Sequence, residues 1–197
     1  MFLLYVVVGY LALYAVIWLH EVGHGIMYSK YKAKGNPFKV HVPFYLFFSN
    51  ANPIDIEKAQ TLTLKKLYNI GIAGIATNLI FGLPLSFLLL SMDFSHTLLY
   101  FFIYSFALFH LVEAATYLVI SNIFLSSDIV LVQQYKPVLR IPLFIIGLAV
   151  TALIIYMIMQ SPTDWQIGYI VTILTMTVCM GLGRMIYSLK NRRVSTE

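Results

Sequence analysis

The chain contains five long apolar stretches, and their length limits its fold more than any other feature of the sequence. A helix needs about 20 apolar residues to cross the hydrocarbon core of a bilayer, and each stretch provides roughly that number. Backbone polar groups in lipid must be paired within the segment, so each stretch is predicted to be a helix. The stretches cover about 2–29, 70–91, 97–122, 140–160 and 166–188. The sequence therefore predicts an all-α polytopic membrane protein with about five transmembrane helices.

The distribution of charge predicts how these helices are oriented. Only 11% of the residues are charged, although the formal net charge is +5. Lysine and arginine lie between the first and second stretches, between the third stretch and the start of the fourth, and at the C-terminal end, whereas the turns at 92–96 and 161–165 contain none. The positive-inside rule then places the N-terminus outside and the C-terminus in the cytoplasm. The basic excess is explained by orientation and by contact with anionic lipid, and we expect no nucleic-acid partner. A prokaryotic plasma membrane is the expected location.

The segment between the first two stretches is the longest hydrophilic part of the chain. Within it, "FKVHVPFYLFF" (38–48) is rich in aromatic and β-branched residues and is flanked by the turn signals "KGNP" and "SNANP". We expect a strand or hairpin close to the membrane over 36–52, where an unwound substrate could add as a further strand. We divide the chain into a three-helix core with this loop (1–130) and two further helices with a short basic tail (131–197).

Three ionisable residues interrupt the first apolar stretch, in "HEVGH" (20–24). Such residues are costly within a membrane and usually have a function there. His20 and His24 are spaced so that both imidazoles lie on one helix face, which is the H-E-x-x-H arrangement of zinc sites. Glu21 is the residue that acts as general base on water in such sites. The alternative is a polar cluster that only joins helices by hydrogen bonds.

A zinc site needs a third protein ligand, which must come from elsewhere in the chain. His20 and His24 fall in the cytoplasmic half of the first helix, and Asp128 follows the third apolar stretch at the same side of the membrane. Glu113 competes with Asp128 on depth, and His110 lies three residues before Glu113 on the same helix face. Both are candidates for the third ligand or for a residue that supports a ligand. His41 is a weaker candidate because it lies in the predicted strand.

Three motifs resemble those of the site-2 protease family, the intramembrane zinc metalloproteases. "HEVGH" (20–24) matches the first core helix of that family, "AGIATN" (73–78) resembles its A-G-P-x-x-N motif, and "NIFLSSDI" (122–129) is similar to its N-x-x-P…L-D-G motif. The resemblance covers roughly 20–130. Ile75 replaces the usual proline, and 122–129 lacks both the prolines and the glycine of the family motif. Prolines there would unwind the helix and bring the aspartate to the metal; in this chain Ser126 and Ser127 would have that task.

The resemblance implies a function and a role for each matching residue. One zinc ion per chain would be bound by His20, His24 and Asp128, with Glu21 as catalytic base and Asn78 near the substrate. The expected activity is hydrolysis of peptide bonds in membrane-anchored proteins or peptides, within or near the bilayer, either in regulated intramembrane proteolysis or in clearance of signal-peptide remnants. A regulatory membrane partner is compatible with the absence of an appended recognition domain. The main alternative is a zinc-binding membrane protein that does not cut: a transporter, an assembly factor or a pseudo-enzyme.

Overall fold

A computed structural model describes residues 2–46 and 48–194, with side chains over 3–46 and 48–183. Five helices in this described part are long and apolar enough to cross a membrane, so the prediction of an all-α chain with about five such helices is confirmed. They are α1 (Phe2–Lys30), α3 (Leu64–Leu90), α4 (Leu98–Ala115) with its continuation to Phe124, α7 (Arg140–Gln160) and α8 (Thr163–Val194).

Short elements join these helices on the side that carries the candidate ligands. A π-helical turn, η1 (Thr116–Ser121), and the single turn α5 (Asn122–Phe124) extend α4, and α6 (Asp128–Tyr135) follows them. A 3₁₀ turn, η2 (Pro137–Leu139), leads into α7. Among the described residues between α1 and α3, only α2 (Ile56–Gln60) is helical.

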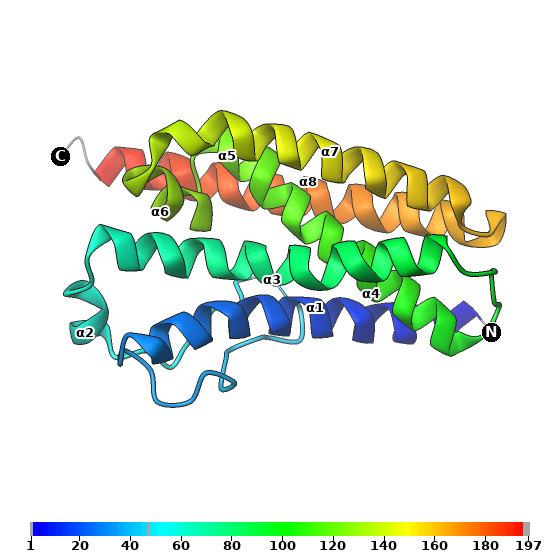
Figure 1. Ribbon diagram of the computed structural model, residues 1–197, viewed down its shortest axis with the longest axis horizontal. Coiled ribbons are helices and arrows are strands. Elements are labelled where there is room, and N and C mark those ends of the chain that lie inside the picture. Colours follow the sequence, from blue (N-terminus) through cyan, green and yellow to red (C-terminus); the bar gives the residue numbers. More distant parts are fainter. Residues whose placement is uncertain (1, 47, 195–197) are drawn as a thin grey trace.

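The helix α4 forms the centre of the bundle. It contacts α1, α3 and α7, and Figure 1 shows it passing obliquely between the α1–α3 pair and the α7–α8 hairpin. Its side chains are buried around most of its circumference, as expected for a helix that is apolar on all faces; Tyr104, Leu108 and Leu111 are at most 1% exposed. The pairs α1–α3 and α3–α6 also make extensive contact, and this contact positions the functional residues.

The hairpin of α7 and α8 is attached to the core at two levels. Towards the α7–α8 turn, the Tyr104 hydroxyl donates to the Met157 carbonyl at 2.5 Å, and the Trp165 ring meets the Phe101 ring edge-on at 4.9 Å. Towards the other end, Gly147 lies so close to η1 that a Cβ there would be 2.8 Å from the Cβ of Leu118. The α7–α8 hairpin therefore packs mainly against α4 and its continuation η1.

The hairpin predicted over 36–52 is wrong. Among the described residues of this loop, only His41 and Asn50 form a bridge, with both backbone N–H···O distances at 3.0 Å. Pro43 has no N–H to donate, and Leu46 and Phe48 have positive φ angles of 67° and 63°, which turn the chain out of the extended conformation. The buried Lys34 ammonium gathers the loop instead, by donating to the carbonyl oxygens of Lys39 (2.7 Å), Ala51 (2.6 Å) and Pro53 (3.0 Å).

This loop does not stay at the end of α1 but turns back along the helix. The Tyr10 hydroxyl donates to the Phe44 carbonyl at 2.5 Å, and the Phe38 ring stacks on the Trp18 ring at 6.4 Å. Tyr10 precedes the end of α1 at Lys30 by about 30 Å of helix, at 1.5 Å per residue. The loop therefore lies alongside the long apolar part of α1, and the rings of Phe44 and Phe48 are exposed on its outer side.

Candidate metal centre

His20 and His24 lie one turn apart on α1 and point in the same direction. Their side chains are 2% and 7% exposed, and their Nε2 atoms are 3.1 Å apart. The two rings meet edge-on, with centroids separated by 4.7 Å. Two buried imidazole nitrogens that converge without a spacer are poorly stabilised unless a proton or a cation lies between them.

Asp128 completes a group of three ligand atoms. Its Oδ2 atom lies 3.3 Å from His20 Nε2 and 3.1 Å from His24 Nε2. Among the described residues, these three are the ones whose ligand atoms meet within 4.8 Å and could hold a metal ion. Atoms about 2.0–2.1 Å from a tetrahedral zinc ion would be separated by about 3.3 Å, close to the spacing seen here. The donor set of two imidazoles and one carboxylate is also one that zinc accepts.

The helix that follows α4 is interrupted so that Asp128 can reach this position. The π-helical turn η1 ends at Ser121, after which Leu125 adopts a left-handed conformation with φ 51°. Ser127 follows with φ 59° and ψ −149°, and α6 begins at Asp128. These irregular residues end the helix before Asp128 and turn the chain so that its carboxylate lies beside the two imidazoles.

Hydrogen bonds behind the ligands fix their orientation. His24 Nδ1 is 2.7 Å from the Ile70 carbonyl oxygen; because a carbonyl only accepts, Nδ1 carries the proton and Nε2 is left to bind a metal. His20 Nδ1 is 3.0 Å from the side-chain amide of Asn78. Burial alone would raise the pKa of Asp128, but the charge of His24 in its protonated form and hydrogen bonds from both imidazoles lower it below its usual value. The carboxyl group is therefore ionised, as a ligand must be.

Two glycines of α3 allow the helices to approach the ligands closely. A Cβ on Gly74 would lie 2.5 Å from His24 Nε2 and 2.6 Å from His20 Cε1, and so would occupy the space in front of the ligand atoms. A Cβ on Gly71 would lie 2.7 Å from the Asp128 carbonyl oxygen. Gly74 belongs to the "AGIATN" segment, and because it has no side chain it leaves room for the two imidazoles.

Glu21 opens into a cavity of about 200 Å³ beside the ligand group. The residue is 7% exposed. The cavity wall combines the ligands His24 and Asp128 with residues from α1, the loop, α3 and α6; the further lining residues are Tyr28, Ser49, Asn50, Ala51, Ile54, Ile70, Tyr117, Ser127 and Leu131. The Glu21 side chain and the candidate ligands His24 and Asp128 therefore border one cavity.

The other polar residues singled out in the sequence lie apart from the ligand atoms. Asn78 is fully buried and, among the described residues, is not part of the cavity wall; it bonds to His20 and to His110 Nδ1, the latter at 2.9 Å. Glu113 is 4% exposed, and its Oε2 atom has no hydrogen-bond partner among the described residues. His41 lies in the loop, in the bridge to Asn50. None of Glu113, His110 and His41 joins the three-residue group.

Sequence reasoning missed Tyr117. Its ring stacks on the His20 imidazole, with centroids 4.8 Å apart and an interplanar angle of 10°, and it lines the cavity. The residue belongs to the π-helical turn, where the helical register shifts by one position relative to an α-helix. A regular helical projection of the third apolar stretch therefore gives no reliable signal for which face Tyr117 occupies.

Comparison of the chain with protein-family models, with curated proteins and with solved structures found no match. Any assignment of function therefore depends on the residues of this chain and on their geometry.

Proposed function

We propose that this protein is an intramembrane zinc endopeptidase of the kind its motifs resemble, the site-2 proteases. One observation carries the proposal: the ligand atoms of His20, His24 and Asp128 converge, and the Glu21 carboxyl group opens into the same cavity. Asp128 is favoured over Glu113 as third ligand because its Oδ2 lies within 3.3 Å of both imidazole nitrogens. Zinc is the proposed cofactor, at one ion per chain.

The chemistry divides between the metal and Glu21. Zinc bound in such a site acts as a Lewis acid that polarises a carbonyl and makes water more acidic. Glu21 takes a proton from the attacking water and then delivers it to the leaving nitrogen of the peptide bond. His24 is held in the ligand tautomer by the Ile70 carbonyl. Burial of Glu21 excludes bulk water, so the proton is passed between the carboxylate and the reacting groups.

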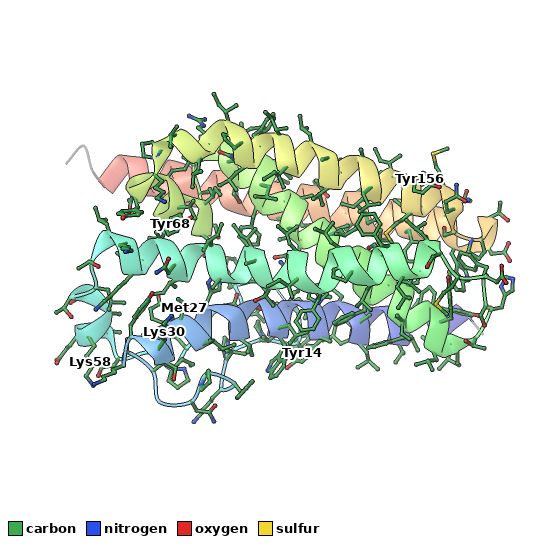
Figure 2. All side chains as sticks on the ribbon, viewed as in Figure 1. Tyr14, Met27, Lys30, Lys58, Tyr68 and Tyr156 are labelled. Carbon is green, nitrogen blue, oxygen red and sulfur yellow. The ribbon has the colours of Figure 1, made fainter. Side chains whose placement is uncertain are left out.

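The depth of the site supports a membrane-anchored substrate. His24 precedes the end of α1 at Lys30 by about 9 Å of helix, and we propose that the ligand group lies inside the membrane near one face. Lys30 and Lys58 lie at the same end of the molecule as the C-terminal end of α8, whereas Tyr156 lies at the other end (Figure 2). We propose that the basic end is cytoplasmic, which puts the active site towards the cytoplasm of a prokaryotic cell.

Zinc content tests the site. We expect about one zinc per chain in detergent-purified wild type, loss of zinc in His20→Ala and Asp128→Ala, and retention in Glu113→Ala. Loss in Glu113→Ala with retention in Asp128→Ala would reverse the choice of third ligand. A wild type that holds no zinc, when purified without chelators, would leave the His20, Glu21 and His24 cluster as a set of interhelical hydrogen bonds.

A second variant separates an enzyme from a protein that only binds zinc. Glu21→Gln removes the proton acceptor but none of the proposed ligands. An endopeptidase is expected to keep its zinc and lose cleavage of membrane-anchored peptides by at least about 100-fold. Zinc-dependent function that is unchanged in Glu21→Gln would instead indicate a transporter, an assembly factor or a pseudo-enzyme.

A further inference from the structure

A continuous chain of hydrogen bonds leads from the candidate ligand His20 into the centre of the bundle. His20 Nδ1 lies 3.0 Å from the Asn78 amide on α3, and the other end of that amide lies 2.9 Å from His110 Nδ1 on α4. Asn78 and His110 are both fully buried. Three residues from three helices are thus connected, and each bond needs one donor and one acceptor.

If both imidazoles are neutral, the hydrogen bonds that join His20, Asn78 and His110 can run in only two directions from donor to acceptor. In the first, the Asn78 amino group donates to His20 Nδ1, and His110 Nδ1–H donates to the Asn78 oxygen. In the second, the amide is turned over, so that His20 Nδ1–H donates to the oxygen and the amino group donates to His110 Nδ1. The structure has Asn78 Nδ2 towards His20 and Oδ1 towards His110, which is the first arrangement.

A metal ion on His20 requires the second arrangement. Nε2 is the atom of His20 that faces His24 and Asp128, so a neutral ligand must carry its proton on Nδ1. The proton of His20 then moves from Nε2 to Nδ1, the Asn78 amide turns over, and the proton of His110 moves from Nδ1 to Nε2. The number of protons on the three residues is unchanged.

The surroundings of His110 permit this exchange. Its Nε2 atom is buried and has no hydrogen-bond partner among the described residues, so no fixed acceptor or donor holds the proton on one nitrogen. The ring stacks on Phe81 at 5.5 Å and meets Phe106 edge-on at 4.5 Å. These rings hold the imidazole in place through dispersion and not through directional bonds, and therefore favour neither tautomer strongly.

We propose that Asn78 and His110 are positioning residues for His20, and that the tautomer of His110 reports whether the site is loaded. This inference rests on the proposed metal site but not on proteolysis. In this proposal Asn78 orients His20 and does not contact the substrate. His110 exchanges its proton between its two nitrogens, which neither a third ligand nor a buried structural histidine would do.

Imidazole ¹⁵N chemical shifts test the inference directly in detergent-solubilised protein. Addition of zinc is expected to move the His110 proton from Nδ1 to Nε2 while His20 and His24 show metal-bound shifts. If His20 and His24 show metal-bound shifts while the His110 tautomer is unchanged, the proposed proton relay from His20 through Asn78 to His110 is wrong, but the proposed metal site is supported. Absence of metal-bound shifts in the wild type would overturn both.

Asn78→Asp provides the sharpest variant. A carboxylate accepts from both histidines, so it can orient His20 for zinc but cannot donate to His110. Zinc affinity should stay within about tenfold of wild type, whereas the His110 proton should remain on Nδ1 with and without zinc. A His110 tautomer that still changes with zinc in Asn78→Asp would contradict the relay.

Zinc affinity, measured by competition with a chelating dye, gives a second readout. Asn78→Ala is expected to weaken zinc binding about 10–100-fold, as for other residues that orient a histidine ligand. His110→Phe should weaken it by less, and His110→Gln should restore it because its amide can donate or accept. Exposed His96 lies in a turn and supplies the control His96→Phe, which should bind zinc like wild type. Equal affinity in Asn78→Ala, His110→Phe and wild type would overturn the positioning role.

Discussion

At the scale of single residues, the space in front of the ligands depends on one missing side chain. A Cβ on Gly74 would lie 2.5 Å from His24 Nε2, closer than any real Cβ contact. Gly74→Ala is therefore expected to displace an imidazole and to reduce zinc occupancy by more than half in purified protein. Gly168→Ala on α8 is the matched control, because a Cβ there meets nothing within 4 Å. Full zinc occupancy in Gly74→Ala would contradict this account of the close approach.

The residue before Asp128 is held in a conformation that normally belongs to glycine. Ser127 has φ 59° and ψ −149°, a region in which an L-residue is strained by roughly 1–3 kcal/mol. Ser127→Gly removes this strain but adds about 0.5–1 kcal/mol of unfolded-chain entropy, so a net gain of about 1 kcal/mol in unfolding free energy is expected. Neighbouring Ser126 has no positive φ, and Ser126→Gly should only lose stability. Thermal unfolding of the two variants in the same detergent compares them, and equal destabilisation would show that the turn is unstrained.

At the scale of elements, sequence length and hydropathy were enough to predict the five long helices. An apolar run of that length in lipid can pair its own backbone polar groups by forming a helix, so the run itself is enough to predict that helix. The short elements could not be predicted in this way, because α6 depends on contact with α3, and the π-helical turn on contact with α7 and α8, and not on their own periodicity. His20, Glu21 and His24 were identifiable because a regular helix fixes their spacing, whereas Tyr117 and the exact path to Asp128 depend on irregular backbone.

The loop between α1 and α3 shows why an alternating pattern misled the prediction. Its apolar and aromatic residues favour a strand, but a buried lysine supplies a stronger organising interaction than one bridge does. Lys34 binds three carbonyl groups of the loop, including that of Ala51, which lines the cavity beside Glu21. The loop is therefore fixed from within by a charged group and presents its aromatic residues outward.

This arrangement predicts a specific effect of removing the ammonium group. Lys34→Met keeps the length of the side chain but cannot donate to carbonyl oxygens, so the segment 49–53 should exchange its amide hydrogens faster, by about tenfold or more. Zinc occupancy should be unchanged, because no ligand lies in the loop. Lys39→Met is the control, since the Lys39 side chain is exposed and only its backbone carbonyl takes part. Exchange at 49–53 that is equal in both variants would show that Lys34 does not hold the loop.

At the scale of the whole molecule, the candidate metal centre lies where three packed elements meet. His20 and His24 come from α1, Asp128 begins α6, and α3 packs against both with Gly71 and Gly74 at the contacts. The chain segments that supply the ligands are separated by more than 100 residues, so a bound ion would connect parts of the bundle that are distant in sequence. Whether α1 and α6 stay in place should thus depend on the metal as well as on packing.

Zinc is therefore expected to stabilise the folded protein as a whole. An ion that binds only the folded state, at a free concentration 100 times its dissociation constant, raises the unfolding free energy by about 2.7 kcal/mol. Thermal unfolding in detergent should shift upward by several degrees when zinc is restored to chelator-treated wild type. Asp128→Asn removes a ligand charge and should abolish most of this shift, whereas Glu113→Gln should retain it, because Glu113 lies outside the ligand group. A shift of equal size in Asp128→Asn and wild type would mean that zinc stabilises the bundle from another place, and that the convergence of α1 and α6 has a purely structural origin.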